Sequence, residues 1–343
     1  MPSSTLKKSP KPRELRPPRP VAITGTGSYV PERVLTNADL ETLVNTSDRW
    51  IFERTGIRER RIAADGEFTS HMAAAAARKA LESAGITAQD VDLIIVATVT
   101  PDTLVPGTAC RVQAMIGASR ANAFDISAAC AGFLYAMEVA RQFIANHTCA
   151  TALVIGADKL SSLMNWTDRN TCVLFGDGAG AAVLQSREDK PGILASFMGS
   201  NGDLAQILQV PGGGCALPIT AENADQNLRT LQMNGRETFK HAVTAMVRSC
   251  LNALDQCGLT PRDIACVIPH QANIRIIEAI SDRLDVPMEK IFINLERFGN
   301  TSAAAVAIAL DEANRTQRIH RGDKLLLVTF GGGLTYAASV IEW

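Results

Sequence analysis

Apolar stretches alternate with amphipathic ones along most of the chain. Short runs that are almost continuously Val, Ile, Leu and Ala predict strands covered on both faces. Longer stretches between them have the spacing of helices. The predicted strands are 21–24, 93–98, 123–126, 152–155, 173–175 with 181–184, 265–268, 324–330 and 337–341. The predicted helices are 70–84, 130–145, 238–256, 274–284 and 302–316. Alternation of this kind is typical of layered α/β proteins.

An internal repeat divides the chain. The segment ALESAGITAQDVDLIIV (80–96) matches ALDQCGLTPRDIACVIP (253–269) without gaps, at an offset of 173 residues. Each copy predicts a helix, a Gly stop, a turn that begins at Thr, and a buried strand. We therefore predict a duplicated α/β fold with two halves, 20–187 and 188–343. A functional site is expected where strand ends of the two halves converge.

Composition and charge narrow the class of protein. The first 19 residues are rich in Pro, Lys and Ser and predict a disordered tail rather than a signal or membrane segment. Of the 343 residues, 46% are hydrophobic and 20% charged, as in soluble globular proteins, and no membrane span is expected. Residues 1–20 hold six Lys or Arg against one Glu, so the remainder, with 28 basic and 34 acidic residues, carries −6. No general attraction to nucleic acid follows, and an acidic partner would need a local basic patch.

Cysteines and glycines mostly suggest structural roles. The eight cysteines show no CxxC pair and no zinc-ligand spacing, which predicts reduced thiols in a cytoplasmic protein and no metal site. The glycine clusters at 25–31 and 176–180 do not open helices, so neither is expected to bind a nucleotide. The glycines at 331–333 follow a strand. They fit either a tight hairpin or a close backbone approach that exposes N–H donors.

Three residues stand out as candidates for chemistry. Cys130 lies where a strand passes into a helix, and a thiol at a helix N-terminus has a lowered pKa. His270 ends the repeat strand of the second half, within a burst of polar residues. Asn300 precedes an Ala-rich helix, where it fits an ordinary N-cap, yet its place in the second half is close to that of Cys130 in the first. Duplication predicts that these residues face one interface.

The motifs around these residues carry a family resemblance. ACAGF with Cys130, PHQAN with His270, GNTSAA with Asn300 and the closing FGGG resemble the signatures of β-ketoacyl-acyl-carrier-protein (ACP) synthase III. That enzyme belongs to the thiolase-like condensing enzymes. The resemblance runs from about residue 20 to the C-terminus. It implies the five-layered αβαβα fold of the family and the first condensation of fatty-acid synthesis.

The resemblance also implies a mechanism. A short acyl-CoA, typically acetyl-CoA, acylates Cys130, malonyl-ACP loses CO2, and its carbanion attacks the thioester. The backbone N–H groups of Cys130 and Gly332 would form the oxyanion hole. His270 and Asn300 would donate hydrogen bonds to the malonyl enolate. CoA and ACP thioesters are then substrates, and no cofactor is implied.

Further positions follow from the same resemblance. Trp50 and Arg169 would flank the adenine of CoA, Arg54 would face its phosphates, and Asn273 would contact pantetheine. Val105, in a position often occupied by Phe, would close the acyl pocket. Arg236 departs from the family, which commonly has Asn there. Three further residues, Lys240, Gln271 and Arg275, would meet ACP. A homodimer is also implied.

Other functions stay open from the sequence. A condensing enzyme of a polyketide or quinolone-type pathway would use the same Cys-His-Asn set. A thiolase would need a second catalytic Cys where FGGG stands, and a hydroxymethylglutaryl-CoA synthase would need a catalytic Glu that we do not find. A non-catalytic scaffold that binds acyl-CoA or ACP would not need the triad.

Overall fold

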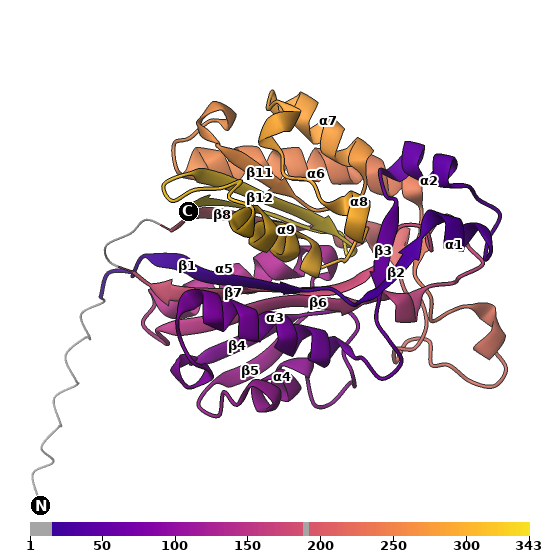
Figure 1. Ribbon diagram of the computed structural model, residues 1–343, viewed down its shortest axis with the longest axis horizontal. Coiled ribbons are helices and arrows are strands. Elements are labelled where there is room, and N and C mark those ends of the chain that lie inside the picture. The colour runs from indigo at the N-terminus through magenta and orange to yellow at the C-terminus, as the bar shows by residue number, and fades with distance from the viewer. Residues whose placement is uncertain (1–15, 188–191) are drawn as a thin grey trace, which may run out of the picture.

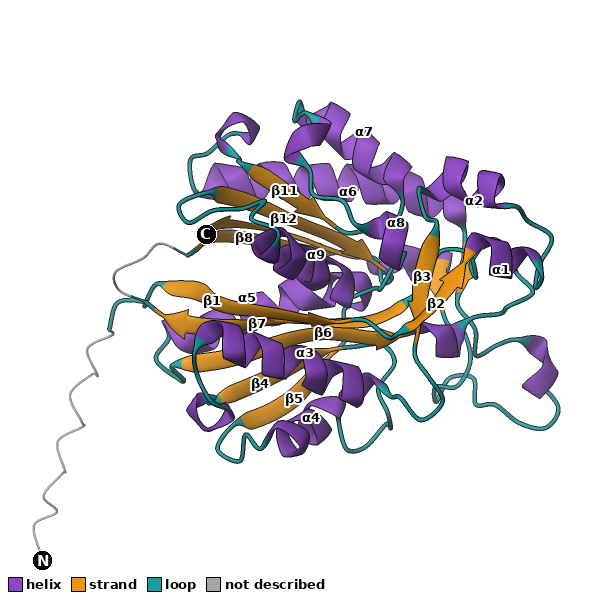
Figure 2. Cartoon of the chain, viewed as in Figure 1, coloured by secondary structure: helices purple, strands orange, loops and turns teal. Residues whose placement is uncertain are grey.

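Five layers of secondary structure are stacked on one another in the computed structural model, which describes residues 16–187 and 192–343. Two sheets alternate with three layers of helices, as Figures 1 and 2 show. This is the five-layered αβαβα arrangement that the family resemblance implies.

The first sheet is mixed and built from the first half. Its strands, in spatial order, are β1 (Val21–Tyr29), β7 (Asp177–Ser186), β6 (Thr151–Lys159), β4 (Leu93–Ala97) and β5 (Asn122–Ile126). β4 pairs in parallel with β5 and β6, whereas β7 pairs antiparallel with β6 and β1. Most of its residues are buried, because helices cover both faces.

The second sheet is smaller and built from the second half. Its strands, in spatial order, are β11 (Cys266–Pro269), β12 (Lys324–Gly331), β13 (Thr335–Glu342) and β8 (Ile193–Ser200). β11 and β12 are parallel, and the other pairs are antiparallel. The short pairs β2 (Arg33–Thr36) with β3 (Glu59–Ile62) and β9 (Leu208–Gln209) with β10 (Gln232–Met233) lie outside both sheets.

Each helix layer draws on a different part of the chain. α3 (Thr69–Ala84) and α4 (Thr108–Ile116) cover the outer face of the first sheet. α6 (Gly235–Gln256) and α7 (Ile274–Leu284) cover the outer face of the second. Between the sheets lie α5 (Gly132–Ala145) from one half and α9 (Ala304–Arg315) from the other. The short helices α1 (Asn37–Glu41), α2 (Asp48–Thr55) and α8 (Leu295–Phe298) lie to one side.

The repeat is visible in local geometry. Thr87 and Asp90 form a capping box, with the Asp90 carboxylate accepting from the Thr87 backbone N–H at 2.8 Å and from its hydroxyl at 2.7 Å. Thr260 and Asp263 form the same box with the same two distances. The glycine two residues before each Thr has a positive φ, as a helix stop requires. The limits of the two halves remain a prediction.

Some sequence predictions are wrong in detail. Residues 173 and 174 lie in a turn instead of a strand, and Phe175 forms an isolated parallel bridge with Asn300. The buried Arg60 guanidinium donates to the Val173 carbonyl at 2.8 Å. The helix predicted at 238–256 begins earlier, at Gly235, after an Asn234 cap. The predicted tail falls partly outside the described residues, and its last part is attached to the fold. There, the Arg19 N–H donates to the carbonyl of Ala145 at 3.1 Å.

Glycines allow the two halves to touch. A Cβ at Gly156 on β6 would lie 2.3 Å from the carbonyl oxygen of Ala303, just before α9. A Cβ at Gly180 on β7 would lie 2.5 Å from the Cβ of Ala307. No larger residue fits either position without moving α9. The N-terminus of α9 is therefore held tightly against the ends of the first sheet.

No helix in the described ranges is both long and apolar enough to cross a membrane.

Candidate active site

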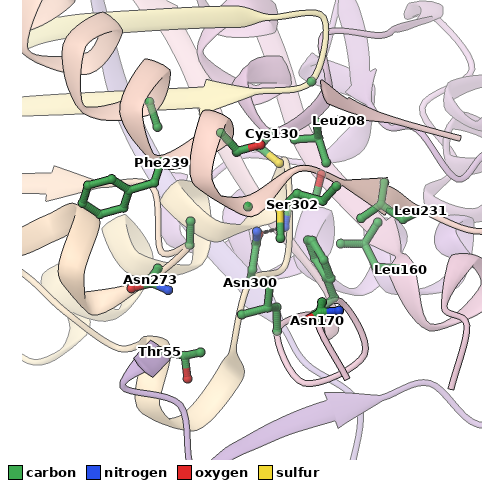
Figure 3. A pocket seen from close by; sticks show the side chains of 18 of the residues that line it. Thr55, Cys130, Leu160, Asn170, Leu208, Leu231, Phe239, Asn273, Asn300 and Ser302 are labelled. Atoms are coloured by element: carbon green, nitrogen blue, oxygen red, sulfur yellow. Dashed lines mark hydrogen bonds between the residues drawn. The ribbon is translucent and has the colours of Figure 1, made fainter. Parts of the chain in front are cut away.

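A cavity of about 640 Å³ opens between the two halves. Its inner part contains all three candidates for chemistry, Cys130, His270 and Asn300, and its outer part contains Trp50 and Arg275. Figure 3 shows Cys130, Asn300 and Ser302 grouped in its wall. The predicted convergence of strand ends therefore forms one site.

Cys130 lies at the N-terminal end of the central helix layer. It is in a 3₁₀ turn, η2 (Ala129–Ala131), that leads directly into α5, and the preceding Ala129 has a φ of +46°. Such a φ is strained for Ala, so the surrounding structure must hold the turn in place. The thiol is only 9% exposed.

Burial changes the expected reactivity of this thiol. A helix N-terminus favours the thiolate, but burial acts in the opposite direction and raises the pKa of Cys130 to about 12. A hydrogen bond to Ser302 lowers the pKa, and the charge of Asp158 raises it further. The prediction of a lowered pKa is therefore wrong, and at neutral pH the group is a thiol.

His270 follows β11 and is 3% exposed. Its backbone N–H donates to the Val328 carbonyl at 2.7 Å, which fixes the residue beside β12. Burial lowers the pKa of the imidazole to about 4, so the ring is neutral at pH 7. Its buried Nδ1 has no hydrogen-bond partner within the described part of the chain. A neutral ring can still donate one hydrogen bond into the cavity.

Asn300 is held by both its backbone and its side chain. Its N–H donates to the Leu174 carbonyl at 2.8 Å, and its own carbonyl accepts from Gly176 at 3.0 Å. The side-chain Oδ1 accepts from the Ser302 N–H at 2.8 Å. Because Oδ1 is fixed in this way, the amide NH2 is left to donate elsewhere. Asn300 is not the N-cap of α9, which is Ala303.

The glycines at the end of β12 come very close to the nucleophile. A Cβ at Gly331 would lie 2.5 Å from the backbone N of Cys130. Gly332 lines the cavity beside it. These glycines also join β12 to β13 in an antiparallel hairpin. Both roles considered for them, the hairpin and the close approach, are therefore present.

Arginines surround an indole at the outer part of the cavity. The guanidinium groups of Arg54 and Arg169 lie 4.7 and 5.0 Å from the centroid of the Trp50 ring. Arg169 also donates to the carbonyl of Asn45 at 3.0 Å. All three side chains line the cavity, so the sequence prediction brought together residues more than 100 positions apart.

The residues predicted to meet pantetheine and ACP divide into two groups. Asn273 and Arg275 line the cavity, and Lys240 is exposed on α6 next to Phe239, which also lines it. Gln271 is different, because it is 1% exposed. Its amide binds the Pro269 carbonyl at 2.8 Å and accepts from the Asn294 N–H at 3.0 Å. The prediction that Gln271 meets ACP is therefore wrong. Arg236, the departure from the family, is exposed and does not line the cavity.

Val105 does not line the cavity of its own chain. It is 86% exposed, beside the 90% exposed Leu104. That it closes an acyl pocket stays a prediction. The apolar wall comes from other residues, among them Leu160, Leu163, Phe175, Leu208, Leu231 and Met246.

Two polar residues at the site were missed from the sequence. Ser302 lies within the GNTSAA motif but was given no role, although it lines the cavity. Asp158 is fully buried behind it, at the end of β6. An acidic residue three positions after the apolar run 152–155 was the available signal.

Comparisons with known proteins agree with this geometry. Two family models match, "3-Oxoacyl-[acyl-carrier-protein (ACP)] synthase III" over residues 124–202 and its C-terminal counterpart over residues 254–343. A "Beta-ketoacyl-[acyl-carrier-protein] synthase III" from Roseiflexus sp. is 54% identical over 322 residues, which are 94% of this chain and 98% of the relative.

Solved structures give the same result. The crystal structure of 3-oxoacyl-[acyl-carrier-protein] synthase III from Aquifex aeolicus has a TM-score of 0.88 and 47% identity, over 94% of this chain and 100% of the other. The priming β-ketosynthase of a polyketide biosynthetic pathway has a TM-score of 0.89 and 35% identity, over 97% and 98% of the two chains.

Proposed function

Because this chain belongs to the β-ketoacyl-ACP synthase III family of acyl-transferring condensing enzymes, we propose that it condenses acetyl-CoA with malonyl-ACP. The product would be acetoacetyl-ACP, the first 3-oxoacyl-ACP of fatty-acid synthesis. One observation carries the proposal: Cys130, neutral His270 and Asn300 line the same cavity.

In the first half-reaction, Cys130 attacks the acetyl thioester. Negative charge then develops on the carbonyl oxygen and needs preorganised donors. The close packing of Gly331 on the Cys130 backbone N supports an oxyanion hole formed by the N–H groups of Cys130 and Gly332. CoA leaves with the thiol proton, and the acetyl group stays on Cys130.

In the second half-reaction, malonyl-ACP loses CO2 and leaves an enolate. His270 and Asn300 donate hydrogen bonds to the enolate oxygen. The low pKa of His270 is compatible with this role, because the neutral imidazole keeps one N–H that can donate. The α-carbon attacks the acetyl carbonyl, and Cys130 is released as the leaving group.

The outer part of the cavity suits an anionic substrate. Arg54, Arg169 and Arg275 line it, in a chain whose remainder is acidic. An adenine stacked on Trp50 would replace one of the two guanidinium groups, and the phosphates would keep the cationic surroundings. Exposed Lys240 and Arg275 would attract an acidic carrier protein.

A homodimer would explain two exposed features. Leu104 and Val105 are the most exposed large apolar side chains in the described residues, and β5 is a sheet edge with an exposed Phe124. A second copy covering this region would bury both. Joint substitution of Leu104 and Val105 by Asp should then yield monomers in sedimentation velocity. Leu251→Asp, at an exposed position on α6, should leave the dimer intact.

All eight cysteines are free, which supports a cytoplasmic location.

A priming synthase of a polyketide pathway is the second candidate, favoured by the likeness to one such structure. The test is to incubate the protein with acetyl-CoA and malonyl-ACP and to detect acetoacetyl-ACP by mass spectrometry. Formation of that product supports the proposal. No product, or equal use of malonyl-CoA as the extender, would count against it.

A further inference from the structure

Arg60, on β3, is the largest side chain that is fully buried in the described part of the chain, and the reaction proposed above does not use it. Burial lowers its pKa to about 10, so the guanidinium is still charged at neutral pH. The three groups that accept its hydrogen bonds are uncharged oxygens. A buried cation is costly, and these hydrogen bonds are what offsets its loss of water. Where they lead is therefore informative.

One nitrogen of the guanidinium holds the segment that leads into α2. NH1 donates to the Leu35 carbonyl at 3.1 Å and to Asn37 Oδ1 at 2.9 Å. Asn37 is itself buried, and its Nδ2 donates to the Asp48 carboxylate at 2.8 Å and to the Ile57 carbonyl at 2.8 Å. Asp48 is the first residue of α2, and Trp50 lies in the same turn. Two hydrogen bonds thus connect the guanidinium to the helix that carries the indole.

The other nitrogen holds the turn beside the inner part of the cavity. NH2 donates to the Val173 carbonyl at 2.8 Å. The next carbonyl, that of Leu174, accepts the Asn300 N–H at 2.8 Å, and the Gly176 N–H donates to the Asn300 carbonyl at 3.0 Å. Phe175, between them, forms the parallel bridge with Asn300. The backbone of a proposed enolate donor is therefore fixed to the turn that the guanidinium binds.

The stem of Arg60 packs against both sides of this bridge. A Cβ at Gly176 would lie 3.0 Å from the Cβ of Arg60, and a Cβ at Gly299 would lie 3.4 Å from it. Gly299 directly precedes Asn300 and has a φ of +62°, a conformation that favours glycine. The chain on either side of Asn300's bridge is therefore in contact with one buried side chain.

We propose that Arg60 is a positioning residue for two parts of the cavity at once, placing α2 in the outer part and Asn300 in the inner part. It touches no substrate, because it is fully buried and does not line the cavity. A guanidinium suits this role, since its rigid planar fork donates in two directions. The inference rests on the function proposed above, in which Trp50 meets CoA and Asn300 meets the enolate.

Arg60→Met removes the donors and keeps an unbranched side chain. KM for acetyl-CoA should rise by about tenfold, the size of one lost hydrogen bond. Decarboxylation of saturating malonyl-ACP should fall by about 10²-fold, because a small misplacement of a catalytic group can cost that much. Acetylation of Cys130 at saturating acetyl-CoA should be nearly unchanged, since the guanidinium has no contact with the thiol or its backbone donors. Equal losses in all three measurements would indicate a purely structural role and overturn the proposal.

Two single variants separate the two sides. Asn37→Ala cuts only the connection to α2, so it should raise KM for acetyl-CoA and spare decarboxylation. Arg61→Met is the matched control, because Arg61 is the next residue on β3 but donates to the Pro31 carbonyl at 3.4 Å and does not line the cavity. It should match the unmodified protein in both measurements. A loss of decarboxylation in Asn37→Ala as large as in Arg60→Met would contradict the two-sided placement.

A double variant tests whether Arg60 acts through Asn300. In the Asn300→Ala background the donor is already absent, so adding Arg60→Met should cause no further loss of decarboxylation. A further loss of about 10²-fold would show that the two residues act independently, and the proposal would be wrong. If Arg60→Met does not fold, Arg60→Lys is measured in the same way, because it keeps the charge but has one amino group in place of the fork.

Amide hydrogen exchange of the whole protein separates this inference from the proposed function. Exchange should become faster in peptides covering 37–55 and 299–302 in Arg60→Met, only in the first in Asn37→Ala, and in neither in Arg61→Met. Unchanged exchange in either segment of Arg60→Met would overturn the placement. If the unmodified protein neither takes an acetyl group nor releases CO2, the proposed function fails, and the exchange pattern still decides whether Arg60 holds both segments.

Discussion

Removing one catalytic group at a time should separate the two half-reactions. Cys130→Ala leaves no acceptor for the acyl group, yet the donors His270 and Asn300 are untouched. This variant should form no acyl-enzyme and still release CO2 from malonyl-ACP. His270→Ala and Asn300→Ala should do the reverse. They keep the thiol and the backbone donors, so they should still accept acetyl from acetyl-CoA and should lose decarboxylation.

The size of the loss follows from the contacts. Loss of one preorganised oxyanion donor typically costs about 10²–10³ in rate, or about 2.7–4 kcal/mol. His270→Ala should fall in this range. Asn300→Ala also removes the acceptor for the Ser302 N–H, a 2.8 Å hydrogen bond that fixes the loop. Asn300→Asp is the sharper variant, because it keeps that acceptor and replaces only the NH2 donor.

Two measurements decide the assignment. Intact-protein mass spectrometry after mixing with acetyl-CoA detects the acyl-enzyme, and release of labelled CO2 from malonyl-ACP measures decarboxylation. Cys130→Ser should also fail at acylation, because an alkoxide forms much less readily than a thiolate. If His270→Ala abolished acylation and left decarboxylation intact, the roles would be reversed. His270 would then be the base for the thiol.

Three further outcomes are expected. Decarboxylation should not fall between pH 8 and pH 5.5 in stopped assays, because His270 has a pKa of about 4 and becomes charged only as the pH falls toward that value; a midpoint near 6.5 would contradict the neutral-donor role. Gly331→Ala should abolish acylation in the mass-spectrometric assay, since its Cβ would lie 2.5 Å from the Cys130 N, whereas Gly202→Ala, with nothing within 4 Å, should be silent. Arg169→Ala should raise KM for acetyl-CoA and leave kcat nearly unchanged; a loss confined to kcat would place Arg169 in the chemistry.

The sequence predicted what repeats and motifs encode. Duplication, buried strands and three short motifs were enough to bring Cys130, His270 and Asn300 together, because each follows a strand end or opens a helix. Strand ends and helix starts depend on the local pattern of apolar and polar residues, which the sequence shows directly. The close approach of Gly331 to the Cys130 backbone was one of the two predicted roles of these glycines, since glycines at a strand end allow such an approach.

Other features depend on tertiary contacts and could not be predicted from the sequence. Gln271 lies in a polar motif, but its amide is used up by the backbone at 292–295. Residues 173–175 have the composition of a strand, but the Val173 carbonyl accepts from the buried Arg60 of β3, and Phe175 forms only an isolated bridge with Asn300. Val105 matches a family position by sequence, whereas its exposure depends on how the loop is oriented. For Gln271 and Val173, contacts with residues distant in sequence decide the outcome.

Two effects act in opposite directions on the pKa of Cys130, one from its local position in the chain and one from tertiary packing. Its position at a helix N-terminus favours the thiolate, and its burial favours the thiol. A thiolate that was permanent in the resting enzyme would be open to oxidation and alkylation. A thiol with no proton acceptor would not attack a thioester. The tight contact between Gly156 and Ala303 keeps the start of α9, next to Ser302 in the cavity wall, close to the buried carboxyl of Asp158 on β6, which accepts the Ala303 N–H at 3.3 Å.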